Sequence, residues 1–136
     1  MIDILKKEIS ESIKVKKLLL DSSDNLKLIE DLVIECIKSL KTAGKSIFCG
    51  NGGSFADSQH LTAEFISKLR FDRNPLPAIA LGTNSSNLTA IGNDYGFEYV
   101  FERELIALHN KNDIFIPIST SGNSENIIRA IKKAEE

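Results

Sequence analysis

The first stretch that could do chemistry is the glycine-rich run Gly50-Asn51-Gly52-Gly53-Ser54. Glycines let the backbone approach a ligand closely, and the free N–H groups at the start of a following helix attract an anion or a sugar oxygen. A dinucleotide fingerprint would need a further glycine where the chain has Phe55, and an ATP-binding loop would need a lysine that the run lacks. NAD and ATP are therefore disfavoured, and a plain strand-to-helix turn remains the alternative.

The second such stretch is the hydroxyl-rich run Ser119-Thr120-Ser121-Gly122-Asn123-Ser124. A phosphate monoester offers three acceptor oxygens, which hydroxyls and helix-start N–H groups can satisfy without a cation. The alternative is an ordinary helix cap with solvated serines, since one Ser or Asn is enough to cap a helix. Four hydroxyls in six residues, after an apolar segment, favour anion binding.

The third candidate is the pair His60 and Glu64, which are four residues apart and so share one face of a helix. Two such side chains can share a divalent metal, and a carboxylate beside a metal can also move a proton. With Ser54 and Asp57 they form a polar stripe that starts at the glycine-rich run. Because His and Glu at this spacing are more often a surface hydrogen-bonded pair, that alternative stays open.

Short apolar segments alternate with helical periodicity after residue 44, and this alternation indicates the elements that position the candidates. We predict strands at residues 46–49, 78–81 and 114–118. We predict helices at residues 54–70, 85–91, 97–109 and 125–136, with a turn at 92–96. Ser54 is expected to be the N-cap of the first of these helices, and His109 a C-terminal cap. Apolar strands without polar alternation are typical of a parallel sheet covered on both faces, where ligands lie beyond the carboxyl ends of the strands.

The first part of the chain, about residues 2–43, has the periodicity of two amphipathic helices. A polar turn at residues 21–24 separates them, and Gly44 is expected to close the second. The 136 residues predict one α/β domain, with the sandwich starting at about residue 45. Three strands are few for such a sheet, and no strand follows the last helix, so we expect a chain cut in mid-fold.

Composition excludes several classes of function. The net charge is −2 and no basic block is present, which disfavours nucleic-acid binding. Apolar runs reach only about five residues, far short of a membrane span, and no signal peptide is expected. The only cysteines, Cys36 and Cys49, have apolar neighbours, so two buried thiols in a reducing compartment, the cytoplasm, are expected.

Four motifs together resemble those of the phosphoheptose isomerases, members of the sugar isomerase (SIS) family: residues 49–54, His60 with Glu64, residues 92–97 and residues 119–124. The resemblance implies a flavodoxin-like sandwich and a homotetramer in which the N-terminal helices pack between subunits. It also implies interconversion of sedoheptulose 7-phosphate and D-glycero-D-manno-heptose 7-phosphate in the cytoplasm, for lipopolysaccharide or capsule.

The resemblance further assigns roles to single residues. The substrate phosphate would be held by Ser119, Thr120, Ser121 and Ser124. The sugar would be lined by Asn51, Gly52 and Gly53, and its hydroxyls met by Asn93 and Asp94. His60 and Glu64 would be ligands of one zinc ion per subunit, and Glu64 would be the base that moves a proton between neighbouring carbons through an enediolate.

Members of the family continue beyond the length of this chain, and a glutamine and a histidine in that later part complete the zinc site. The resemblance therefore leaves other functions open. One is a non-catalytic module that binds phosphosugars or associates with the replication initiator DnaA. The other is an inactive truncated remnant. From the motifs retained here we expect an isomerase, while the 136 residues alone are expected to be inactive and to associate or aggregate.

Overall fold

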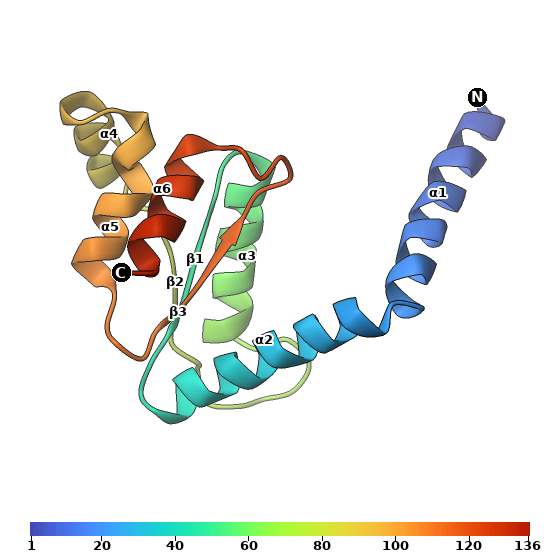
Figure 1. The fold of residues 1–136 in the computed structure, drawn as a ribbon, viewed down its shortest axis with the longest axis horizontal. Helices are drawn as coiled ribbons and strands as arrows, with labels where there is room; N and C mark the ends of the chain where they lie inside the picture. Colours follow the sequence, from blue (N-terminus) through green and yellow to red (C-terminus); the bar gives the residue numbers. More distant parts are fainter. The chain divides into compact units, whose positions relative to one another are not determined.

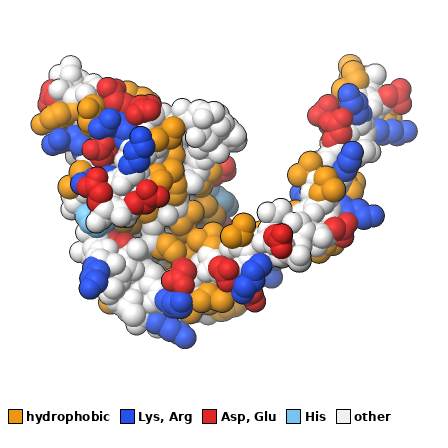
Figure 2. All heavy atoms as spheres, viewed as in Figure 1, with side chains coloured by type: hydrophobic (Ala, Val, Ile, Leu, Met, Phe, Trp, Pro, Cys, Tyr) orange, Lys and Arg blue, Asp and Glu red, His pale blue; other side chains and the backbone are white.

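A computed structural model describes all residues, 1–136, and their contacts divide the chain into two compact units, Met1–Ile37 and Lys38–Glu136. The first unit holds α1 (Ile2–Leu20) and most of α2 (Ser23–Lys41), as the sequence predicted. No residue of α1 is buried. Hydrophobic side chains lie open along both helices, between lysines and acidic residues (Figure 2). No helix in the chain combines the length and the apolar character needed to cross a membrane.

The second unit is built on a parallel three-stranded sheet in the order β2-β1-β3 (Figure 1). The strands are β1 (Ser46–Gly50), β2 (Ala78–Ala80) and β3 (Ile114–Ile118). Every residue of β1 is buried, and after Ser46 the strand has no polar side chain, as is typical of a central strand covered on both faces. The order matches the first three places of the flavodoxin-like arrangement, so the predicted fold class is confirmed.

Helices cover both faces of the sheet (Figure 1). On one face lies α3 (Gly53–Ile66), where Phe48 of β1 meets Phe65 edge-on, with ring centroids 5.6 Å apart. On the other face lie α5 (Val100–Leu108) and α6 (Glu125–Ala134). The core on that side consists of Ile47, Cys49, Leu81, Val100, Phe101, Leu105, Ile127 and Ala130. Successive residues of β1 therefore serve opposite layers, as the pleat of a strand requires.

Three predicted helix boundaries were wrong. α3 ends at Ile66 instead of near residue 70. α4 (Ser85–Asp94) continues through Gly92, so Asn93 and Asp94 belong to its last turn and not to the predicted loop. A 3₁₀ turn at Phe97–Tyr99 precedes α5, where one helix was predicted. The end of α3 is capped from further along the chain: the Arg73 guanidinium donates hydrogen bonds of 2.6 Å and 2.8 Å to the carbonyls of Glu64 and Phe65.

Two predicted caps were also wrong. The N-cap of α3 is Gly52, with φ of +56°, whereas Ser54 is buried inside the first turn. After α2 the left-handed residue is Ala43, with φ of +60°, and not Gly44. Gly44 is needed for a different reason, since a Cβ there would lie 2.1 Å from the carbonyl oxygen of Asn112. The chain can pass Asn112 this closely only without a side chain.

Candidate functional site

The two loops singled out by composition meet at the carboxyl end of the sheet. β1 and β3 are neighbours, and Gly50 pairs with Ile118 at the point where both strands end. Between the loops lies a small cavity of about 80 Å³. We call it the serine cup; its lining is Asn51, Ser54, Ile118, Ser119, Thr120, Ser121 and Ser124. All four hydroxyl residues predicted to bind phosphate are thus in one place, beside two residues of the glycine-rich run, Asn51 and Ser54.

The hydroxyls of the serine cup keep their donor capacity. Ser119 Oγ accepts a hydrogen bond of 3.1 Å from the backbone N–H of Gly122. Ser121 Oγ accepts one of 3.2 Å from the N–H of Asn123. Ser124 occupies the N-cap position of α6, but its side chain makes no capping hydrogen bond. Because a hydroxyl that only accepts still has its proton to donate, the arrangement suits an anion better than it suits a simple helix cap.

The glycine-rich run leaves its backbone open. A Cβ on Gly52 or on Gly53 would meet no atom within 4 Å, so a ligand can approach the chain there. Gly50 is required by packing, because a Cβ at that position would lie 2.4 Å from the carbonyl oxygen of Ser54. On its other side the run borders a second cavity of about 190 Å³, lined by Gly50, Asn51, Gly52, Phe55, Gly82, Leu88, Phe97 and Phe101.

One residue of the site was missed by sequence reasoning. Asn126, in the first turn of α6, is 3% exposed and exchanges two hydrogen bonds with Asn51, each 2.9 Å long. The two residues are 75 positions apart in the sequence. No local pattern announces such a pair; the only hint is that an asparagine precedes the apolar Ile127 on the buried face of a predicted helix.

His60 and Glu64 lie on α3, outside the serine cup. His60 Nε2 is 3.5 Å from Glu64 Oε1, and the two side chains are 73% and 27% exposed. Glu64 is ten residues after Ser54, about 15 Å along the helix axis. The two side chains are suitable zinc ligands in type and spacing, but no group of three or more His, Cys, Asp or Glu side chains forms a metal site in this chain. They supply two of the three or four protein ligands that zinc requires.

Asn93 and Asp94 are exposed at the end of α4. The Asn93 amide donates a hydrogen bond of 2.8 Å to the Asp94 carboxylate. Neither residue lines the serine cup or the cavity beside it. The structure therefore brings together the predicted phosphate-binding residues and Asn51, and leaves these two predicted sugar-binding residues apart from them.

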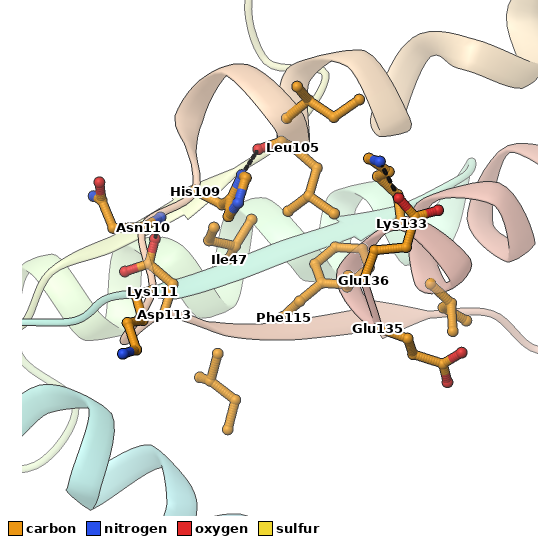
Figure 3. Close-up of a pocket in the computed structure, with 14 residues that line it drawn as sticks. Ile47, Leu105, His109, Asn110, Lys111, Asp113, Phe115, Lys133, Glu135 and Glu136 are labelled. Atoms are coloured by element: carbon orange, nitrogen blue, oxygen red, sulfur yellow. Dashed lines mark hydrogen bonds and ion pairs between the residues drawn. The ribbon is translucent and has the colours of Figure 1, made fainter.

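The largest cavity, about 560 Å³, lies at the opposite, amino end of β1 and β3 (Figure 3). Two of its polar groups already have partners. His109 Nδ1 lies 2.9 Å from the Leu105 carbonyl oxygen, which confirms His109 as the cap of α5. Asp113 is held by Lys45 at 2.5 Å. Although this cavity is larger than the serine cup, we place the site at the cup, because the chemistry of parallel α/β sheets belongs to the carboxyl ends of their strands.

A parallel α/β fold with a hydroxyl-rich loop at the carboxyl ends of its strands is typical of proteins that bind phosphorylated ligands. Comparison with known proteins gives the family. The family model of the SIS domain matches residues 13–136. The chain belongs to this family, in the group of the phosphoheptose isomerases. It is 48% identical to the phosphoheptose isomerases of Clostridium acetobutylicum and of Aneurinibacillus thermoaerophilus, over 100% of this chain and 69% of each relative.

Solved structures give the same result. The phosphoheptose isomerase GmhA from Neisseria gonorrhoeae superposes with a TM-score of 0.88 at 39% identity, covering 98% of this chain and 68% of that one. A phosphoheptose isomerase from Francisella tularensis superposes with a TM-score of 0.91 at 35% identity, covering 98% and 69% of the two chains. The predicted resemblance is thereby confirmed.

Proposed function

We propose that this protein is an aldose–ketose isomerase that converts sedoheptulose 7-phosphate to D-glycero-D-manno-heptose 7-phosphate, in the cytoplasm, for lipopolysaccharide or capsule. The observation that carries the proposal is the serine cup, which fits a phosphate monoester, in a chain whose relatives are named phosphoheptose isomerase. Because the relatives carry that name, a non-catalytic phosphosugar-binding module is not favoured.

The phosphate binds in the serine cup. Ser119, Thr120, Ser121 and Ser124 donate hydroxyl hydrogen bonds to its oxygens. The start of α6 adds backbone N–H groups and the positive end of its dipole. No lysine or arginine lines the cup, so recognition uses neutral donors alone.

The sugar extends from the cup along the glycine-rich run. Asn51 lines both the cup and the neighbouring cavity, and the open backbone of Gly52 and Gly53 allows sugar hydroxyls to come close. Asn93 and Asp94 meet hydroxyls further along the sugar. This last assignment comes from the family motif alone and needs a substrate that reaches the end of α4.

Glu64 acts as the base. It takes the proton from C1 of the ketose and returns it to C2, while the hydroxyl and carbonyl oxygens exchange a proton through the enediolate. His60, 3.5 Å away, lies beside the carboxylate. Both side chains are also proposed as ligands of one zinc ion per subunit, which supplies polarisation of the sugar oxygens when bound.

The protein is proposed to form a homotetramer through its N-terminal helices. α1 buries no residue, and Ile2, Leu5, Ile9 and Ile13 repeat along it at helical spacing with 58% or more of each exposed. An apolar stripe of this kind needs another surface to cover it. Light scattering should give four times the chain mass, and replacing Ile9 and Ile13 by serine should lower it.

The proposal is tested at the cup by calorimetric titration with sedoheptulose 7-phosphate. Replacing both Ser119 and Ser121 by alanine should weaken binding by at least about a hundredfold, because each lost hydrogen bond to a charged group is worth about 1.5–3 kcal/mol. Ser85→Ala, at the start of α4 and outside the cup, is the matched control and should bind as the wild type does. Unchanged affinity in the double variant would remove the basis of the proposal.

A further inference from the structure

We propose that Asn126 is a positioning residue that holds the Asn51 amide between the serine cup and the neighbouring cavity, and that it thereby favours esterified phosphate over bare phosphate. The inference rests on the proposed function, since it takes the cup to be the phosphate site. Asn126 itself lines neither cavity and acts only through Asn51.

The burial of Asn126 needs an explanation. It precedes Ile127, and both are 3% exposed, at a place where packing alone would favour an apolar side chain. A buried amide is tolerated only when its hydrogen-bonding groups have partners. Asn51 provides them: Asn126 Nδ2 donates to Asn51 Oδ1, and Asn51 Nδ2 donates to Asn126 Oδ1, both at 2.9 Å. Each of the two polar atoms of the Asn126 side chain thereby has one partner.

The Asn51 side chain can still form hydrogen bonds with a ligand. A primary amide has two N–H donors and two acceptor lone pairs, and the pairing uses one of each. Asn51, which is half-buried, therefore keeps one N–H and one lone pair, held in the plane that the pair defines. A hydroxyl group can donate to one and accept from the other. This matches the chemistry of a sugar, whereas a phosphate dianion can use only the donor.

The pair also joins two elements that bind different parts of the ligand. Asn126 is on α6, whose preceding loop carries the hydroxyls of the cup, and Asn51 is on the glycine-rich run. A bare phosphate needs only the hydroxyl-rich loop. A phosphate ester needs the loop and the run at a fixed separation, and the amide pair sets that separation. Losing the pair should therefore reduce the affinity for the ester more than that for inorganic phosphate.

The test is calorimetric titration of the 136-residue chain with inorganic phosphate and with sedoheptulose 7-phosphate. Asn126→Ala should weaken binding of the sugar phosphate about tenfold and that of inorganic phosphate less than about twofold. In the Asn51→Ala background the same change should have less than about a twofold effect on either ligand, because its only route is through Asn51. Asn112→Ala, which also removes a side-chain amide hydrogen bond but at the other end of the sheet, is the control and should leave both affinities unchanged.

If Asn126→Ala fails to fold, Asn126→Asp carries the test. It keeps the acceptor for Asn51 Nδ2 and loses the donor, and its added charge repels both ligands alike, so the ratio of the two affinities remains the measure. Three results would overturn the inference while the proposed function stands. The affinity for both ligands could fall equally, the effects of Asn126→Ala and Asn51→Ala on affinity could multiply, or neither affinity could fall. If the wild-type chain binds neither ligand, the proposed function fails and the inference falls with it.

Discussion

The backbone N–H of Gly82 donates a hydrogen bond of 2.5 Å to Oε2 of Glu104, a carboxylate that is 5% exposed. Gly82 follows β2 and has φ of +82°, and Glu104 lies on α5, so the bond joins the end of an edge strand to a helix. Glu104 therefore satisfies a backbone group that would otherwise be buried without a partner.

Replacing Glu104 by alanine should lower the free energy of unfolding by about 1–3 kcal/mol, because the buried Gly82 N–H loses its acceptor. Glu104→Gln retains an acceptor oxygen and should lose less. Urea denaturation followed by circular dichroism measures both. An alanine variant within about 0.5 kcal/mol of the wild type would show that the bond contributes little.

The ion pair of Lys45 and Asp113 should make stability depend on acid pH. The Asp113 side chain is 5% exposed. Its burial raises the pKa, but hydrogen bonds from the Lys45 ammonium and from the backbone N–H groups of Asn110 and Lys45, with the attraction of the ammonium charge, bring the pKa below its ordinary 3.8. A pKa lowered by folding stabilises the folded state above pH 3.8, and this contribution is lost as the pH falls through the folded-state pKa.

At pH 7, Asp113→Asn should unfold at lower urea concentration than the wild type, by about 1.5–3 kcal/mol in free energy. The difference between the two proteins should shrink as the pH falls from 3.8 through the lower pKa of the folded wild-type carboxyl group, which then becomes protonated as well. Urea titrations at pH 7, 4 and 3 give the comparison. A difference that stays constant across these pH values would contradict the assignment.

Cys49 should be inert in the folded protein. Its side chain is fully buried in β1, and burial raises the pKa of the thiol to about 12. At pH 8 only about one thiol in ten thousand is then ionised, and the thiolate is the reactive form. In a Cys36→Ser background, iodoacetamide should leave Cys49 unmodified until urea unfolds the chain, as read by mass spectrometry. Rapid modification without urea would show that β1 opens readily.

In a full-length version of the protein, Glu64→Gln should abolish turnover of sedoheptulose 7-phosphate while the sugar phosphate still binds, because the amide keeps the shape and loses the base. A fall in kcat of at least about a hundredfold with a dissociation constant within about threefold is expected. Glu135→Gln, at the C-terminal end of α6, is the control for removal of one carboxylate. If Glu64→Gln retained activity within about tenfold of the wild type, a barrier change of about 1.4 kcal/mol, Glu64 would not be the base.

Strands and loops were predictable from the sequence because their signals are local. Residues 114–118 form β3 as predicted, since all five residues are apolar and half-buried in a parallel sheet that helices cover. The hydroxyl-rich run lies at the serine cup because it follows such a strand at the carboxyl end of the sheet. The end of α3 was not predictable in this way, since it depends on Arg73, which returns to cap Glu64 from nine positions later.

The hydroxyl residues that line the serine cup could be named from the sequence, but Asn126 and the way the two loops come together could not. The partner of Asn51 is Asn126, and no periodicity reports a contact over 75 positions. Gly92 indicated a turn by composition, yet α4 continues through it because the helix is held at both ends, by the Asn84 side chain and by the Tyr95 N–H bonded to Ile91. Capping contacts of this kind outweigh the weak helix preference of a single glycine.

The absence of lysine and arginine from the lining of the serine cup sets how the site should respond to ionic strength. Attraction between full charges acts over about 8 Å at physiological ionic strength and weakens as salt is added. Hydroxyl and backbone N–H donors act only at contact, and the chain carries a net charge of −2, so nothing draws an anion in from a distance. The ligand is therefore selected by contacts inside the serine cup, after it has entered. The affinity of the cup for its ligand should vary little between dilute buffer and high salt.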